Sequence, residues 1–197
     1  MLENIHHILI LVFLGLVAGS FATALAHRIP EGKSWIKTRS ACPHCQKKLG
    51  VQDLVPVFSW IFLKGKCRHC KAPIGVSYPL IELLSVAAFF GVYAGWGFTP
   101  EAFIVMAAVP FLLALLVIDI RHMLLPDQLV VSVAVVAAIF IAYFGAISGF
   151  GRGFVDLLLN GLAGGIFYGV LALTVGLLVG KALKKDALGK SGRYIPT

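Results

Sequence analysis

Long runs of apolar residues, separated by short polar and basic segments, make up most of this chain. A helix needs about 20 consecutive, mostly apolar residues to cross the hydrocarbon core of a bilayer. About five runs approach this length, at residues 8–26, 78–95, 102–118, 129–147 and 155–179. The pattern therefore predicts an all-α polytopic membrane protein with about five transmembrane helices.

Composition agrees with this class and excludes a soluble domain. Hydrophobic residues form 59% of the 197 residues and charged residues 13%, whereas soluble domains are about 45–50% apolar and about 25% charged. No Lys or Arg precedes the first run, only Glu3, His6 and His7 among ionisable residues, and it ends in Ala-His-Arg instead of a small-residue cleavage site. We therefore interpret it as a retained helix and not a signal peptide. We predict no internal repeat.

The basic residues predict how the helices are oriented. If the N-terminus lies outside, the segments 27–77, 119–128 and 180–197 face the cytoplasm and hold 16 of the 17 Lys and Arg residues. Cytoplasmic loops are enriched in these residues, so an N-out, C-in topology is expected. Ten of them lie between Arg28 and Lys71. Because this block separates two apolar runs, it favours anionic lipid over nucleic acid as its partner.

All four cysteines lie in this basic segment, as the pairs Cys42-Pro-His-Cys45 and Cys67-Arg-His-Cys70. Two such pairs about twenty residues apart are typical of a zinc ribbon, in which two turns supply four thiolates. Two disulfides or free thiols are the alternatives, and a reducing cytoplasm argues against disulfides. The intervening histidines are alternative ligands. The sequence favours a structural Zn²⁺ that folds this loop and leaves no position open for hydrolysis.

An apolar stretch at residues 53–63 lies between the cysteine pairs. It is too short to span a bilayer and contains Pro56. A re-entrant or an interfacial segment beneath the zinc ribbon is expected.

Carboxylates in or beside apolar runs are candidates for function, because such positions are unfavourable for charge. Asp119 follows the third run directly, and its structural alternative is a salt bridge to Arg121 or His122. Two carboxylates that share one proton can activate water and protonate a leaving amine. Asp119 supplies one such acid, and its partner is expected after the fifth run, near Gly189.

Three further acids have simpler structural explanations. Asp127 follows Pro126 and is placed to cap the fourth transmembrane helix. Glu82 lies just inside the second apolar run and has Arg28 as a candidate partner. Asp186 is expected to be a solvated charge in a basic tail.

Several motifs, in order along residues 15–190, resemble one family, the bifunctional type IV prepilin leader peptidases and N-methyltransferases. The residues that carry the resemblance are Gly19-Ser20-Phe21, His27-Arg28-Ile29-Pro30, the cysteine loop from Ser40 to Cys70, Tyr78-Pro-Leu-Ile-Glu82, and Ile118-Asp119 with Leu124-Leu-Pro-Asp127. The resemblance implies a peptidase that removes the leader of prepilins or pseudopilins at the cytoplasmic face of the bacterial inner membrane. It also implies methylation of the new N-terminus with S-adenosylmethionine, in type IV pilus or type II secretion systems.

Roles for individual residues follow from the same resemblance. Asp119 matches the first catalytic aspartate, and the four cysteines match the zinc ligands. Glu82 and Lys66 are candidates for methyl transfer. The implied organisation is a first transmembrane helix (1–26), a zinc-binding loop (27–77) and a peptidase core (78–190), with residues 191–197 outside the resemblance.

The sequence departs from the family at the second aspartate, which belongs to a Gly-x-Gly-Asp motif. Here Gly189-Lys190 is followed by Ser191-Gly192, where the family has Gly-Asp. We therefore expect this chain to be inactive as a peptidase. The alternatives are methyl transfer without cleavage and a non-catalytic membrane scaffold that docks prepilin through its zinc ribbon.

Overall fold

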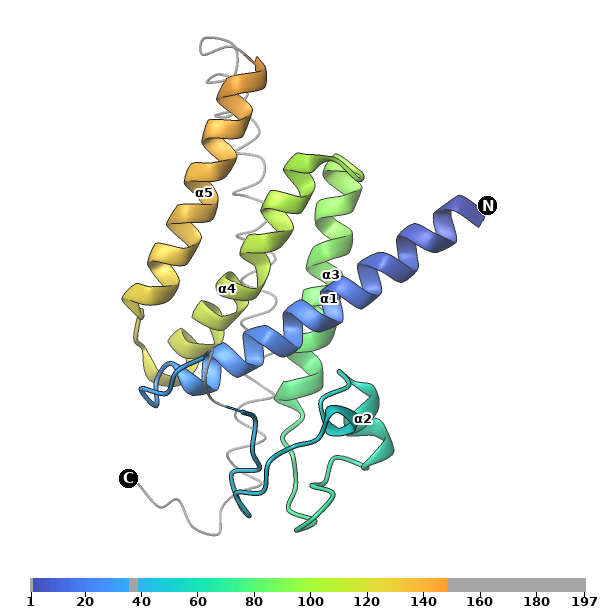
Figure 1. Ribbon diagram of the computed structural model, residues 1–197, viewed down its shortest axis with the longest axis vertical. Helices are drawn as coiled ribbons and strands as arrows, with labels where there is room; N and C mark the ends of the chain where they lie inside the picture. Colours follow the sequence, from blue (N-terminus) through green and yellow to red (C-terminus); the bar gives the residue numbers. More distant parts are fainter. Residues whose placement is uncertain (1, 36–38, 149–197) are drawn as a thin grey trace.

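The structure is a computed structural model that describes residues 2–35 and 39–148. Four long helices make up most of this part: α1 (Leu2–Arg28), α3 (Ser77–Trp96), α4 (Pro100–His122) and α5 (Asp127–Ser148). Two short elements, η1 (Val51–Asp53) and α2 (Phe58–Phe62), lie in the connection between α1 and α3 (Figure 1). No strand forms in the described residues, which confirms the all-α class; the connection contains only two isolated β-bridges.

The four long helices coincide with the first four predicted transmembrane runs. Each is long and apolar enough to cross a membrane, with a mean hydropathy of 1.5 to 2.7 over its best window. This confirms a multi-pass helical architecture. The fifth predicted run, Asp186, and the stretch from Gly189 to Thr197 lie outside the described residues. The N-out orientation stays a prediction.

Two apolar clusters hold the helices together where α1 crosses α3 and α4 obliquely (Figure 1). One lies near the end of α1 and joins Leu25, Ile81, Ile118 and Leu129 from four different helices. The other lies further along the bundle and joins Leu11 to residues of α3 and α4. Outward side chains such as Phe13, 66% exposed, remain uncovered, as expected of helices whose outer faces meet lipid.

Two glycines one turn apart let α1 and α3 approach closely. A Cβ added at Gly15 would lie 2.7 Å from Val86 Cα, and one added at Gly19 would lie 2.6 Å from Glu82 Cα. Gly15 and Gly19 therefore form a small-xxx-small face of the kind that packs membrane helices backbone to backbone. Our sequence interpretation overlooked this motif in the first helix.

We expect Gly19→Ala to destabilise the bundle by about 1–3 kcal/mol, because the added methyl group meets the backbone of α3. Gly95→Ala is the matched control, since nothing lies within 4 Å of a Cβ added there. Alanine at this helical position should stabilise by up to about 1 kcal/mol. Thermal unfolding of both variants in detergent, followed by circular dichroism, measures the contrast. Equal effects of the two substitutions would contradict this close approach.

Short turns between the helices bring the zinc-binding loop and the ends of several long helices to one end of the bundle. Gly97, with φ 63°, ends α3, and Thr99 caps α4 by accepting a hydrogen bond from the Ala102 N–H at 3.3 Å. As a result, α1 and α4 end, and α3 and α5 begin, at the same end of the bundle (Figure 1). We call this the loop end, because the long connection from Ile29 to Val76 lies there.

Candidate metal centre and acidic site

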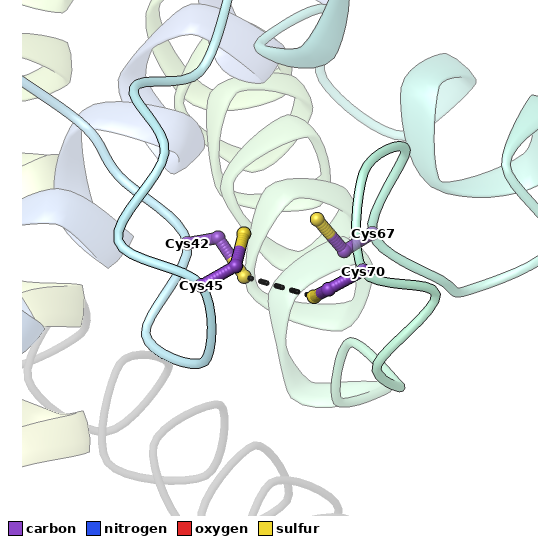
Figure 2. A group of neighbouring side chains, drawn as sticks. All are labelled: Cys42, Cys45, Cys67 and Cys70. Carbon is purple, nitrogen blue, oxygen red and sulfur yellow. Dashed lines mark hydrogen bonds between the residues drawn. The ribbon is translucent and has the colours of Figure 1, made fainter.

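The four cysteines converge from two loops on one point (Figure 2). Their sulfur atoms all lie within 4.8 Å of one another, and Cys42 Sγ is 3.8 Å from Cys70 Sγ. In a tetrahedral zinc site, Zn–S bonds of about 2.3 Å separate the sulfur atoms by about 3.8 Å. The donor set and its spacing therefore fit one Zn²⁺ ion, as the sequence indicated.

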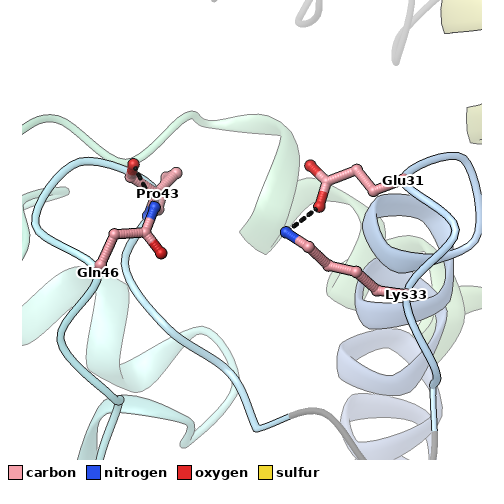
Figure 3. Close-up of polar contacts among 4 residues, drawn as sticks. All are labelled: Glu31, Lys33, Pro43 and Gln46. Atoms are coloured by element: carbon pink, nitrogen blue, oxygen red, sulfur yellow. Dashed lines mark hydrogen bonds and ion pairs between the residues drawn. The ribbon is translucent and has the colours of Figure 1, made fainter. Parts of the chain in front are cut away.

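Backbone hydrogen bonds shape the first cysteine turn. The Cys42 N–H donates to Lys47 O at 3.0 Å, and the Gln46 N–H donates to Cys42 O at 2.9 Å. Gln46 is left-handed, with φ 56°, and its side-chain amide donates to Pro43 O (Figure 3). This geometry directs the thiols of Cys42 and Cys45 to the same side of the turn.

The second cysteine turn repeats the first at an offset of 25 residues. The Cys67 N–H donates to Ala72 O at 2.8 Å, the Lys71 N–H donates to Cys67 O at 3.0 Å, and Lys71 has φ 59°. Residues 40–51 and 65–76 share the pattern Cys-x-His-Cys followed by Gly-Val five and six residues later. The expectation of no internal repeat is therefore wrong, and a comparison of the two cysteine segments would have revealed it.

The thiols differ in how readily they lose a proton. Hydrogen bonds from the backbone N–H groups of Cys70 and His69 lower the pKa of the Cys67 thiol to about 7. A hydrogen bond from the Ala72 N–H favours the Cys70 thiolate, but desolvation and the neighbouring thiols raise the pKa of Cys70 to about 11. Zinc binds the thiolate form of cysteine, so binding of Zn²⁺ would displace thiol protons from this cluster.

An ion pair fastens η1 to the second cysteine turn. Arg68 Nε lies 2.6 Å from Asp53 Oδ1, and the side chain of Asp53 is 8% exposed. The hydrogen bond from Arg68 holds the pKa of the Asp53 carboxyl below its usual value. The carboxylate also accepts a hydrogen bond from the Gly50 N–H. The segment between the cysteine pairs is thus attached to the second cysteine turn. By contrast, the exposed ion pair between Glu31 and Lys33 (Figure 3) is of a kind that contributes little to stability.

Trp60 of α2 packs on the second cysteine turn. Its indole Nε1–H donates to Ile74 O at 3.1 Å, and its ring covers Gly65, where a Cβ would lie 3.0 Å from Trp60 Cζ2. Gly65 also has φ 67°, which disfavours other residues. The stretch at residues 53–63 is therefore part of the ribbon fold.

Glu82 is buried, with 8% of its surface exposed, between α1 and the zinc-binding loop. Glu82 Oε2 accepts a hydrogen bond from the Val57 N–H at 2.6 Å, and the Ser20 hydroxyl also bonds to the carboxylate. The partner weighed from the sequence, Arg28, instead donates to Ser40 Oγ at 2.9 Å. Glu82 thus joins α1, α3 and the start of α2.

Lys66 lies in a different environment from Glu82. It forms an isolated β-bridge with Pro73 in the second cysteine turn, and its side chain is exposed. The assignment of Glu82 and Lys66 to methyl transfer stays a prediction.

Asp119 lies in the last turn of α4 with its side chain exposed at the loop end. Its carbonyl accepts a hydrogen bond from the Met123 N–H at 2.9 Å, where the left-handed Met123 ends the helix. Within residues 2–35 and 39–148, Asp119 forms no ion pair. Arg121 contacts His27 Nε2 at 3.5 Å and Ser77 Oγ at 3.4 Å. The carboxylate of Asp119 therefore remains accessible.

The contacts of Arg121 belong to a polar cluster that the sequence did not reveal. The His27 ring stacks on Tyr78 with centroids 5.0 Å apart and planes 8° from parallel. Arg121, His27 and Ser77 bring together the end of α1, the start of α3 and the end of α4. This cluster fixes the helix ends around Asp119.

Asp127 lies in the first turn of α5 and not at the N-cap as predicted. The Pro126 carbonyl accepts hydrogen bonds from the N–H groups of Leu129 and Val130, so Pro126 occupies the N-cap position. The carboxylate of Asp127 still faces a favourable helix dipole at this position. The loop between α4 and α5 is short, and both acids flank it.

A family model described as the bacterial peptidase A24 N-terminal domain matches residues 13–96. The chain is 33% identical over 186 residues to a prepilin leader peptidase/N-methyltransferase of Myxococcus xanthus, covering 94% of this chain and 52% of that protein. It is 32% identical over 194 residues to an Escherichia coli protein named type 4 prepilin-like proteins leader peptide-processing enzyme. This match covers 89% of this chain and 69% of that protein.

A prepilin leader peptidase/N-methyltransferase of Pectobacterium carotovorum is 31% identical over 140 residues, covering 60% of this chain and 50% of that protein. The chain therefore spans about half the length of several curated relatives it matches. No solved structure matches it.

Proposed function

Because the chain belongs to the family of prepilin leader peptidases/N-methyltransferases, we propose that it processes the leader of type IV prepilins or pseudopilins. The observation that carries this proposal is an accessible Asp119 at the same end of a membrane-helix bundle as a complete four-cysteine cluster. The basic residues gather at this same end, which favours its placement at the cytoplasmic face of the bacterial inner membrane.

Asp119 would act as one member of a pair of acids. In such a pair one carboxylate takes a proton from water, which attacks the scissile carbonyl, while the protonated partner donates to the leaving amine. Mutual repulsion keeps one of the two protonated, so both roles are filled at once. The exposure of the Asp119 side chain at the loop end of α4 supports a role on a peptide bond just outside a bilayer.

The second acid decides whether this chain cleaves. The stretch from Gly189 to Gly192 has no carboxylate where the family motif has its aspartate. We propose that the chain is inactive as a peptidase for this reason, although it retains the zinc-binding loop.

For the N-methyltransferase activity in its relatives' names, S-adenosylmethionine supplies the methyl group when bound. This chain's contribution would be to hold the new N-terminal amine near the zinc-binding loop. The cysteines build that loop, and Glu82 fixes it to α1 and α3. Glu82 would therefore position the methyl-transfer site, and Lys66 would lie at its surface.

Restoring the motif tests the proposal. We expect the unaltered chain to leave a prepilin-type peptide intact, and the double variant S191G/G192D to remove its leader. Mass spectrometry after incubation in detergent with S-adenosylmethionine detects both leader loss and the 14 Da added by a methyl group, about the mass of one CH₂. Zinc content measured on both proteins controls for folding.

Three results would contradict parts of this proposal. Cleavage by the unaltered chain would mean that another acid, with Asp127 and Asp186 the first to replace, already partners Asp119. An inactive double variant would show that the missing acid is not the cause of inactivity. Prepilin binding by the double variant with neither cleavage nor methylation would favour a scaffold.

A further inference from the structure

The segment from η1 to α2 exposes an apolar face at the loop end of the bundle. Phe62 is 81% exposed, Ile61 57% and Phe58 53%. Val51, Leu54 and Val55 are exposed beside them. No charged residue lies between positions 54 and 63. Contiguous apolar surface of this kind marks a site of contact with a membrane or with another protein.

A hydrogen bond fixes the depth of this face relative to the membrane helices. The Val57 N–H, directly before α2, donates to Glu82 Oε2 at 2.6 Å. Glu82 lies five residues beyond the start of α3 at Ser77, which is about 7.5 Å along a helix. Ser20, the other partner of Glu82, lies eight residues before the end of α1 at Arg28, about 12 Å along that helix.

The start of α2 therefore lies within reach of a side chain that belongs to the second turn of α3. The interfacial layer of a bilayer is about 5–8 Å thick on each side. Amphipathic helices bury their apolar faces about 5–10 Å into the boundary between headgroups and acyl chains. The position of Glu82, about 7.5 Å from the start of α3, falls in this range and anchors the start of α2 near it.

The charges next to α2 are basic. Lys64 and Lys66 follow the helix and are exposed, as is Lys71 in the second cysteine turn. The one acid of the segment, Asp53, is already paired with Arg68. Basic groups at this depth attract anionic lipid headgroups. The charge of the surface therefore complements an anionic membrane.

We propose that α2 is an interfacial anchor that inserts Phe58, Ile61 and Phe62 into the acyl boundary of an anionic membrane. Lys64 and Lys66 bind the lipid phosphates. Trp60 and Glu82 hold the helix from its protein side, through Ile74 O and the Val57 N–H. The anchor fastens the zinc ribbon against the membrane surface, and it does not depend on whether the chain cleaves or methylates a substrate.

Photo-crosslinking of the zinc-loaded full chain in lipid vesicles tests the anchor. A benzoylphenylalanine residue replaces Phe62, and the matched control replaces Gln46, which is exposed on the first cysteine turn. In vesicles of phosphatidylglycerol and phosphatidylcholine, we expect lipid adducts at position 62 at least about tenfold above those at position 46. Equal labelling at both positions, or adducts at position 62 to a second protein chain, would overturn the proposal.

Two further variants test the charge and the depth. The charge reversal K64E/K66E should reduce adducts at position 62 severalfold in anionic vesicles and leave them unchanged in vesicles of phosphatidylcholine alone. Glu82→Ala should reduce adducts in both kinds of vesicle, because the start of α2 is released. Zinc content equal to that of the unaltered chain shows that each variant retains its ribbon. If neither change alters the amount of lipid adduct at position 62, the assigned depth and the assigned contact with anionic lipid would both be overturned.

Discussion

Replacing Cys42 by serine should remove the bound zinc and unfold the connection between α1 and α3. The cysteine turns bury little apolar surface, and Cys42 and Cys67 are their only buried hydrophobic side chains within the described residues. In small zinc-binding domains the metal contributes about 10–16 kcal/mol to folding at neutral pH. We expect zinc content to fall from one ion per chain to background, and limited proteolysis to cut rapidly between residues 40 and 74.

The membrane helices should survive this change, because their clusters of Leu25 with Ile118 and Leu11 with Phe89 lie outside the ribbon. Far-ultraviolet circular dichroism would therefore remain nearly unchanged. His44→Ala is the matched control, since this exposed histidine lies between two ligands and is expected to be dispensable. Zinc retained by Cys42→Ser, or lost from His44→Ala, would contradict the four-thiolate centre.

Asp119→Asn should abolish leader cleavage in the S191G/G192D background. Asparagine has nearly the shape of aspartate but cannot exchange a proton with water or with the leaving amine. Positioned acid or base groups contribute about 10²–10⁴-fold to rate, so we expect the cleavage rate to fall by at least that factor. Quantitative mass spectrometry of the cleaved prepilin peptide over time measures it.

Asp127→Asn is the matched control for this change. Asp127 is an exposed carboxylate eight residues later, on the other side of the same short loop. We expect its replacement to leave the rate within about twofold, because its position in the first turn of α5 suggests a favourable interaction with the helix dipole. A loss equal to that of Asp119→Asn would instead assign Asp127 to the acid pair. A cleavage rate unchanged by Asp119→Asn would contradict a peptidase role for Asp119.

The polar cluster around Arg121 offers a physical reason why Asp119 has a defined place. Arg121 Nη2 lies 3.4 Å from Ser77 Oγ and Arg121 Nη1 lies 3.5 Å from His27 Nε2, which connects α4 to α3 and α1. The ends of three helices are thereby fixed in relation to one another. A carboxylate in the last turn of α4 is then held by rigid elements, a condition that acid–base catalysis requires.

The sequence by itself determined the elements whose physical cause is local. Apolar runs of sufficient length set the four described membrane helices, because the bilayer thickness fixes how many residues a span needs. The cysteine spacing was sufficient to predict the four-cysteine cluster, since Cys-x-x-Cys turns direct two thiols to one side. The motifs from Gly19 to Asp119 were sufficient to indicate the family.

Only the tertiary structure decided which distant residues meet. The partners of Glu82 are Ser20 of α1 and the Val57 N–H of the zinc-binding loop, residues separated from it by 62 and 25 positions along the chain. The role of Gly19 likewise depends on α3 lying against it. Such contacts depend on how helices cross, and a sequence pattern records the period of each helix but not the neighbour that each face receives.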